Sequence, residues 1–141
     1  FIIFNLLFGD TSDFDEEMKS SGIITNTLYY NLLNIDTHFI ITLTNSGDKY
    51  EELILEIEKR LKNISFNESE LERKKKVLIS NEIFSYENIE MVNEMIIDNI
   101  LFDNRIETNI IEMINSLNID ELNEVVNKID FNKKSIVILS K

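Results

Sequence analysis

The chain has 141 residues, of which 43% are hydrophobic and 28% charged, so it can bury the core of one soluble domain or of part of one. It contains no cysteine, which excludes a disulfide framework and a thiolate metal site and fits a reducing, cytoplasmic environment. The net charge of −12 argues against binding to nucleic acid or to an anionic membrane, because both need a basic surface.

Two short helices are predicted first. Residues 1–8 (FIIFNLLF) are apolar but lack the basic region and the cleavage site of a signal peptide. We interpret them as the end of a helix whose packing partners precede the chain, which would make the chain a piece of a longer protein. Residues 13–21 predict a second helix that ends before Gly22, a residue suited to the left-handed C′ position. Thr11 and Ser12 are its candidate N-caps.

Two antiparallel strands are predicted next, at residues 23–32 and 37–44. Both are rich in β-branched and aromatic side chains, and an Asn/Asp break at residues 34–36 separates them. In the second strand, apolar residues at 39, 41 and 43 alternate with a more mixed set, so one face is expected to be apolar. Tyr29 and Tyr30 fall on opposite faces of the first strand, so one is expected in the core and one at the surface.

The rest of the chain is predicted to be mostly helical, with helices at about 48–64, from 67 onward, at about 88–102, at about 105–116 and from 118 to 129. Asn67 with Glu70 resembles a capping box, and Asn118 with Glu121 is predicted to cap the last helix. Apolar residues recur at helical spacing and are expected to form the inner faces. They are Tyr50, Leu53, Ile54, Ile57, Leu61, Ile64, Leu71, Leu78, Ile79, Ile89, Val92, Met95, Ile96, Leu101, Ile106, Ile110, Met113, Ile114, Leu122, Val125, Val126 and Ile129.

A final strand is predicted at residues 135–139. This continuous apolar run of strand length indicates a strand that is buried on both faces. The predicted fold is therefore α+β, with a small, mostly antiparallel sheet that is covered by helices on one side. No linker composition and no repeat is visible, so residues 1–141 are interpreted as a single partial domain.

Motifs that would carry chemistry do not emerge from the residues. The one histidine, His38, cannot form a two-histidine zinc site and is expected to be a half-exposed strand residue. The acidic residues at positions 10, 13, 15, 16 and 17 do not fit a calcium-binding loop, and a helix N-terminus accounts for them better. The basic run at 73–76 is interpreted as a solvated helix face, and the three glycines do not form a phosphate-binding loop. No catalytic and no metal-ligating residue is expected.

The segment from Gly9 to the first strand resembles a known family. GDTS at residues 9–12 is followed by a short helix and then by GII at residues 22–24. This order is similar to the small-residue turn, short helix, Gly-Leu step and strand in the homologous domains of insulinase/pitrilysin-type zinc peptidases. By this resemblance, Gly9 turns the chain sharply out of one helix, and Gly22 turns it from the next helix into the sheet.

Two later segments extend the resemblance over residues 4–140. ELERKKK at residues 70–76 is similar to the family's helix start ELERxK, and NIDEL at residues 118–122 resembles the TxEDV opening of its final helix. The bacterial, processing-peptidase-like branch is the most similar, and the frequent Ile, Asn and Lys residues fit an AT-rich genome. The resemblance implies half of a metallopeptidase clam-shell domain.

The same resemblance implies that the chain is the C-terminal, non-metal portion of such a peptidase. The zinc ligands of the family, an inverted HxxEH motif and a downstream Glu, belong to the N-terminal half, where zinc polarises the carbonyl and a Glu activates water. The C-terminal half lends an Arg and a Tyr to substrate binding, and alignment on Gly22 places Met18 and Thr25 at those positions. Neither functional residue is retained, and Tyr29 or Tyr30 would make peptide contacts in place of the Tyr only in a shifted register.

The expected role is thus a non-catalytic chamber wall with peptide contacts, and the zinc would lie in the N-terminal half. The expected partners are that half or a homologous subunit, a peptide substrate, and a second copy of the chain if a sheet edge stays unpaired. The missing Arg and Tyr favour an alternative, an inactive paralogue that acts as a structural or assembly partner of an active subunit. A third interpretation is a generic α+β domain with a helical interaction role.

Overall fold

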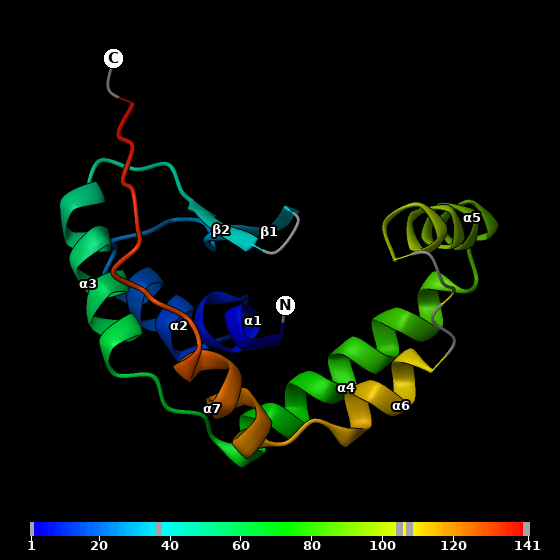
Figure 1. The fold of residues 1–141 in the computed structure, drawn as a ribbon. Helices are drawn as coiled ribbons and strands as arrows, with labels where there is room; N and C mark the ends of the chain where they lie inside the picture. Colours follow the sequence, from blue (N-terminus) through cyan, green and yellow to red (C-terminus); the bar gives the residue numbers. More distant parts are fainter. Residues whose placement is uncertain (1, 36–37, 104–105, 107–108, 140–141) are drawn as a thin grey trace. The chain divides into compact units, whose positions relative to one another are not determined.

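The computed structural model describes residues 2–35, 38–103, 106 and 109–139, and it shows a mostly helical α+β protein. The chain divides into two compact units, one of residues 1–66 and 123–141 and one of residues 67–122. Among the described residues, no helix combines the length and the apolar character needed to span a bilayer. In chain order, the elements are α1 (Ile2–Phe8), α2 (Asp13–Ser20), β1 (Tyr29–Ile35), β2 (His38–Thr44), α3 (Tyr50–Lys62), α4 (Glu68–Ser85), α5 (Ile89–Asp98), the π-helix η1 (Asn99–Asp103), α6 (Ile110–Ser116) and α7 (Ile119–Asn127) (Figure 1).

The core of the first unit is centred on α1 and α2. Leu7 and Phe8 are fully buried, and the Phe8 ring meets the Phe14 ring of α2 edge to face, with centroids 5.0 Å apart. Such aromatic pairs add to the stabilisation from burial of apolar surface. The buried apolar residues of this unit are Ile3, Phe4, Leu6, Leu7, Phe8, Phe14, Met18, Ile24, Leu28 and Leu53.

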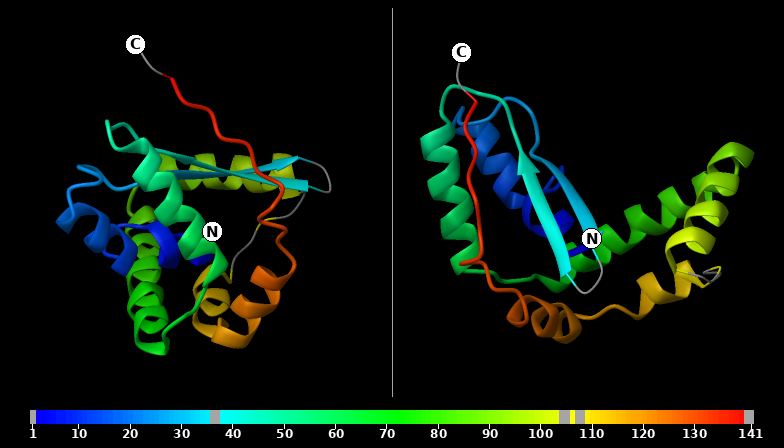
Figure 2. Two further views of the ribbon diagram at one scale, coloured as in Figure 1. Left: turned by 90° about the vertical axis from the view of Figure 1, so that its left-hand side faces the viewer. Right: turned by 45° about the horizontal axis from the view of Figure 1, so that its top comes forward.

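β1 and β2 form a two-stranded antiparallel sheet, in which Tyr29 pairs with Thr44 and Ile35 pairs with His38. Helices α1 and α2 lie on one side of this hairpin (Figures 1 and 2). Within β2, Ile41 is less exposed than its neighbours in sequence, as expected for the apolar face. The prediction of two antiparallel strands is confirmed.

The first strand begins later than predicted. Residues 23–28 are irregular, because their apolar side chains anchor the chain to the core instead of pairing in the sheet. Ile24 and Leu28 are buried, and the backbone N–H groups of Ile23 and Ile24 both donate to the Met18 carbonyl oxygen. The predicted break at residues 34–36 was also placed too early, since β1 runs through residue 35, and residues 36–37 lie outside the described part of the chain.

The second unit contains α4, α5, η1 and α6. Three asparagines begin helices here as N-caps: Asn67 accepts a hydrogen bond from Ser69 N at 2.9 Å, and Asn88 accepts from Glu90 N at 2.9 Å. Asn118 accepts from Glu121 N at 3.0 Å, which confirms the predicted cap of α7. The predicted helices are present, although α6 begins at residue 110, and residues 104–105 and 107–108 lie outside the described residues.

Several predicted inner-face residues of the helices are exposed. The predictions for Ile89, Leu101 and Val125 were wrong, because helical periodicity identifies an apolar stripe but not whether another element covers it. The same holds for Tyr50, Ile106 and Met113. Leu53, Leu71 and Leu122 are buried as expected, and the remaining predicted inner residues are half-buried.

The predicted final strand is absent from the described residues. Residues 134–139 are irregular, and Val137 and Leu139 are 81% and 94% exposed, so the prediction of a strand buried on both faces was wrong. A strand needs a hydrogen-bonding neighbour, and the hairpin does not pair with this segment. At the first of these irregular residues, the Lys134 ammonium forms an ion pair with Glu58 of α3 and lowers the pKa of that carboxyl.

Candidate functional site

The turn between α1 and α2 requires glycine at its first position. Gly9 N donates to the Asn5 carbonyl oxygen at 3.0 Å, and the Gly9 carbonyl oxygen accepts from Ser12 N at 3.0 Å. A Cβ atom on residue 9 would lie 2.4 Å from the Asn5 carbonyl oxygen, closer than any side chain tolerates. Thr11 completes the turn in the left-handed region, with a φ of 63°.

Ser12, one of the two candidate N-caps, is the N-cap of α2. Its Oγ accepts a hydrogen bond from Asp15 N at 3.2 Å, and the residue is buried. The first turn of α2 also carries Asp13, Asp15 and Glu16, whose negative charges interact favourably with the helix N-terminus. The acidic cluster thus lies at a capped helix start, as the sequence indicated.

Lys19 joins this helix start to the segment that leads into β1. Its Nζ donates to Asp15 Oδ2 at 2.8 Å and to Thr27 Oγ1 at 2.7 Å, and it lies 3.6 Å from Asp10 Oδ1. The hydrogen bond to Asp15 raises the pKa of Lys19, and the charges of Asp15 and Asp10 act in the same direction. The Lys19 ammonium therefore compensates part of the negative charge of Asp10 and Asp15.

Asp15 is the most enclosed member of this cluster. Its side chain is buried, and its Oδ1 atom has no hydrogen-bond partner among the described residues. The Asp15–Lys19 spacing of four residues is a helix pair that sequence reasoning could have identified. The contribution of Thr27 had no such local signal, because it comes from beyond the end of the helix.

Gly22 ends α2 in a Schellman motif. Ile23 N donates to the Met18 carbonyl oxygen at 2.9 Å, and Gly22 N donates to the Lys19 carbonyl oxygen at 3.1 Å. Gly22 has a φ of 69°, which confirms the predicted left-handed C′ position. The motif redirects the chain toward Ile24 and the hairpin.

Met18 and Thr25, the two positions that the resemblance aligns with an Arg and a Tyr, differ in environment. Met18 is buried in the core of the first unit, and Thr25 is exposed. A buried methionine has neither the charge nor the access to contact a substrate. Position 18 is therefore structural in this chain.

Tyr29 and Tyr30 are neighbours in β1 with different exposure: Tyr29 lies at the surface as predicted for one of the two, whereas Tyr30 is half-buried and does not belong to the core. Tyr29 is 68% exposed, whereas the Tyr30 hydroxyl accepts a hydrogen bond from Asn5 Nδ2 at 2.7 Å. Burial raises the pKa of Tyr30, and the hydrogen bond from Asn5 opposes that shift. Tyr29 is thus the more exposed of the two tyrosines.

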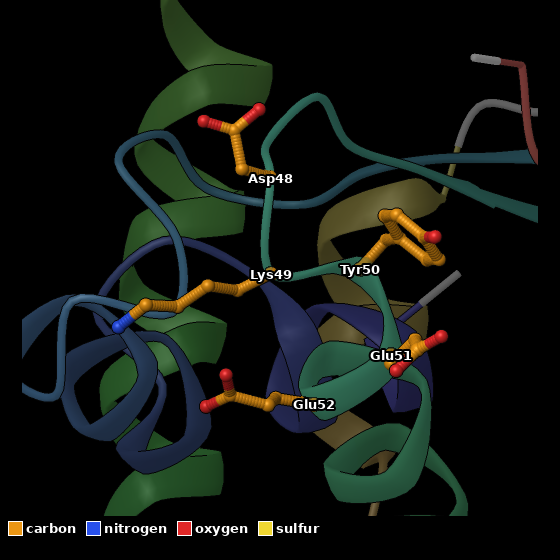
Figure 3. A pocket seen from close by; sticks show the side chains of 5 residues that line it. All are labelled: Asp48, Lys49, Tyr50, Glu51 and Glu52. Carbon is orange, nitrogen blue, oxygen red and sulfur yellow. The ribbon is translucent and has the colours of Figure 1, made fainter.

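A shallow depression of about 210 Å³ lies at the start of α3 and is lined by five consecutive residues, Asp48, Lys49, Tyr50, Glu51 and Glu52. Figure 3 shows that these side chains diverge: Asp48 points one way, Lys49 and Glu52 another, and Tyr50 and Glu51 a third. Because they do not converge on a common point, this depression lacks the geometry of a built binding site.

Two lysines of the basic run at 73–76 are buried, so its interpretation as a solvated helix face was wrong for these two residues, whereas Arg73 and Lys76 are exposed. Lys74 and Lys75 are 6% and 7% exposed. The Lys75 Nζ donates to Glu72 Oε1 at 2.6 Å and to the Asn115 carbonyl oxygen at 3.3 Å. It thereby links α4 to the last turn of α6, where a positive charge is favourable.

Among the described residues, no group of three or more His, Cys, Asp or Glu side chains is placed to hold a metal ion. Within the described part of the chain, no set of side chains is therefore assigned to zinc. His38, at the start of β2, is exposed.

Comparisons with protein-family models, with curated proteins and with solved structures found no match to this chain. In the described part of the chain, residues 9–30 provide a turn that requires glycine, a capped helix and an exposed tyrosine, and the Ser12 hydroxyl is committed to the helix cap.

Proposed function

We propose that this chain is the non-catalytic C-terminal portion of an insulinase-like zinc metallopeptidase, in which it forms chamber wall and peptide contacts. One observation carries the proposal: the order of the elements from α1 to β2. A glycine turn leads into a serine-capped helix, a left-handed Gly22 ends that helix, and an antiparallel hairpin follows. The resemblance implies this order for half of a clam-shell domain, in which helices cover one side of a small sheet.

In this role the chain supplies surface, and the hydrolytic chemistry belongs to the N-terminal half, where the resemblance places the zinc. Tyr29 is the exposed aromatic residue nearest in sequence to the positions of the missing Arg and Tyr, and it offers a face on which a peptide can pack. The chain has 26 acidic residues against 14 basic ones, which favours cationic or neutral peptides over acidic ones.

An inactive paralogue that acts as a structural or assembly partner of an active peptidase subunit is the second candidate. The burial of Met18 favours it, because the position that carries the substrate-binding Arg in active relatives is part of the core here. In that case the same surface would face a partner subunit instead of a peptide.

Zinc content and peptide cleavage separate the two candidates. Both are measured on the complete gene product, with the present 141-residue chain assayed beside it. Stoichiometric zinc and cleavage in the gene product, with neither in the chain alone, support the chamber-wall role. A gene product without zinc supports the inactive paralogue. Zinc-dependent cleavage by the chain alone contradicts both candidates.

Peptide binding by the chain itself tests the contact residue. A fluorescently labelled cationic peptide is titrated with the chain, and its anisotropy is followed for Tyr29→Ala and for Tyr50→Ala, a matched control at another exposed tyrosine. Loss of a central aromatic contact weakens binding by about tenfold or more, so Tyr29→Ala should do so and Tyr50→Ala should not. Equal effects of the two substitutions would contradict the assignment of Tyr29.

A further inference from the structure

The two-stranded hairpin is an incomplete sheet. Among the described residues, neither β1 nor β2 has a second strand as a neighbour, so each strand has an outer edge along which no other strand pairs. Edge strands are normally protected by charged residues, prolines or bulges, and the sequences YYNLLNI and HFIITLT contain no Asp, Glu, Lys, Arg or Pro. A two-stranded sheet is also only marginally stable by itself. The hairpin is therefore able to accept a further strand.

Residues 135–139 are an apolar segment of strand length that does not pair with the hairpin. They have the sequence SIVIL, which has high β-propensity, yet Ile136, Val137, Ile138 and Leu139 are all exposed. Their backbone groups form no hydrogen bond with any described residue. Figures 1 and 2 show the segment running out beyond the packed helices and the hairpin of its own unit. Such an apolar segment is stabilised by pairing with a sheet edge.

The charge of the chain favours a second copy as the source of that edge. Residues 133–141 contain three of the chain's 14 basic residues and none of its 26 acidic residues, so a basic segment extends from a strongly acidic chain. The segment of one copy is therefore attracted to the body of another, which offsets part of the repulsion between two acidic chains. The ion pair of Lys134 with Glu58 meanwhile holds the start of the segment on α3.

We propose that residues 135–139 of one copy pair as a third strand with the hairpin edge of a second copy, and that the second copy reciprocates. The product is a two-fold symmetric dimer formed by strand exchange, in which each copy gives one strand and receives one. The dimer extends each sheet to three strands and covers Val137 and Ile138. This inference does not rest on the proposed peptidase role and holds equally for an inactive paralogue.

Sedimentation equilibrium of the chain tests the dimer. Val137→Lys/Ile138→Lys places a charge on each face of the exchanged strand, and Leu55→Lys/Val77→Lys is the control, since it adds the same charge at other exposed apolar positions. The unmodified chain should form a dimer that dissociates on dilution. The 137/138 variant should raise the dissociation constant by roughly tenfold to a hundredfold, and the control by less than about threefold. A monomer at all concentrations, or equal effects of the two variants, overturns the proposal.

Cross-linking separates exchange from closure onto the chain's own hairpin. The chain has no cysteine, so single cysteines can be introduced at Val137 and at Asn31 or Thr42, which lie opposite each other in the hairpin. Copies with Val137→Cys and copies with Asn31→Cys or Thr42→Cys carry different tags and are mixed with a short bismaleimide. A cross-link between the two tags, at one of the two strands, supports exchange. A link formed within single chains that carry both cysteines, without a link between tags, overturns it.

Discussion

Residues 2–28 and the helices α5 and α6 differ in how many of their apolar side chains are buried. Helix α1 buries five of its seven residues, whereas α5 and α6 contain no buried residue. Both regions carry apolar stripes, but α1 packs against α2, whose Phe14 ring meets the Phe8 ring of α1. An apolar stripe thus makes a helix suitable for packing, and only a second element with matching shape makes it a core.

The largest difference in unfolding free energy should come from alanine substitutions at an apolar residue in each of the two regions. Phe8 is fully buried between Phe4 and Phe14, and Phe8→Ala should lower the free energy of unfolding by about 3–5 kcal/mol. Ile89 is 76% exposed, and Ile89→Ala should change it by less than about 0.5 kcal/mol. Urea titration followed by circular dichroism measures both. A loss at Ile89 comparable to that at Phe8 would show that α5 packs against a surface outside the described residues.

Two glycine substitutions sharpen the comparison at the level of the backbone. Gly9→Ala places a Cβ 2.4 Å from the Asn5 carbonyl oxygen and should destabilise the chain by about 1–3 kcal/mol, because the obstructing atom belongs to the backbone. At Gly47, the nearest atom to an added Cβ is 4.0 Å away, so Gly47→Ala should be neutral or stabilise by up to about 1 kcal/mol. Thermal unfolding of the two variants checks the sign as well as the size. The interpretation of the Gly9 turn fails if both variants have the same midpoint.

Local signals explain why much of the secondary structure was predictable. Ser12, Gly22 and Asn118 act through hydrogen bonds to residues within a few positions, so a single sequence contains the whole interaction. Residues 135–139 show the opposite case, because whether this stretch is a strand depends on a partner that its own sequence does not encode. The same reasoning applies to Val125, whose exposure depends on what lies across from its helix.

In the candidate site, too, local interactions were predictable from the sequence and contacts between separate elements were not. The turn and cap at residues 9–12 were predictable from their residue types, and strand alternation predicted that one of Tyr29 and Tyr30 is at the surface, but not that the other is only half-buried. Lys19 contacts Thr27, and Tyr30 contacts Asn5. Each of these contacts joins separate segments of the chain, and no spacing rule identifies them. The burial of Lys74 and Lys75 was missed for a similar reason, since a run of four basic residues ordinarily indicates solvent exposure.

Removal of a helix N-cap in each of the two units should change the free energy of unfolding by smaller and less different amounts. Ser12 is buried and caps α2, so Ser12→Ala should cost about 1–2 kcal/mol, at the upper end for an N-cap. Asn67 is an exposed cap of α4, and Asn67→Ala should cost about 0.5–1 kcal/mol because water can replace the lost acceptor. The same urea titration, with Ser12→Thr as a variant that retains the hydroxyl, measures both. If Ser12→Thr is as destabilising as Ser12→Ala, packing around Ser12 matters more than its hydrogen bond.

The smallest expected effect is a pH dependence that belongs to Lys19. Its pKa is raised in the folded chain, chiefly by the hydrogen bond to Asp15, so the folded state holds the proton more tightly than the unfolded state does. The contribution of Lys19 to stability is therefore complete below its unfolded pKa of about 10.4 and is lost as the pH rises through the higher folded value. The difference in unfolding free energy between the unmodified chain and Lys19→Gln should accordingly be constant from pH 7 to about pH 9.5 and shrink above about pH 10.4. Because Tyr30 is present in both proteins, its own alkaline titration cancels in this difference. A difference that stays constant to the alkaline limit would mean that Lys19 supports α2 through the packing of its aliphatic stem, and that its charge among Asp10, Asp15 and Thr27 adds nothing to folding.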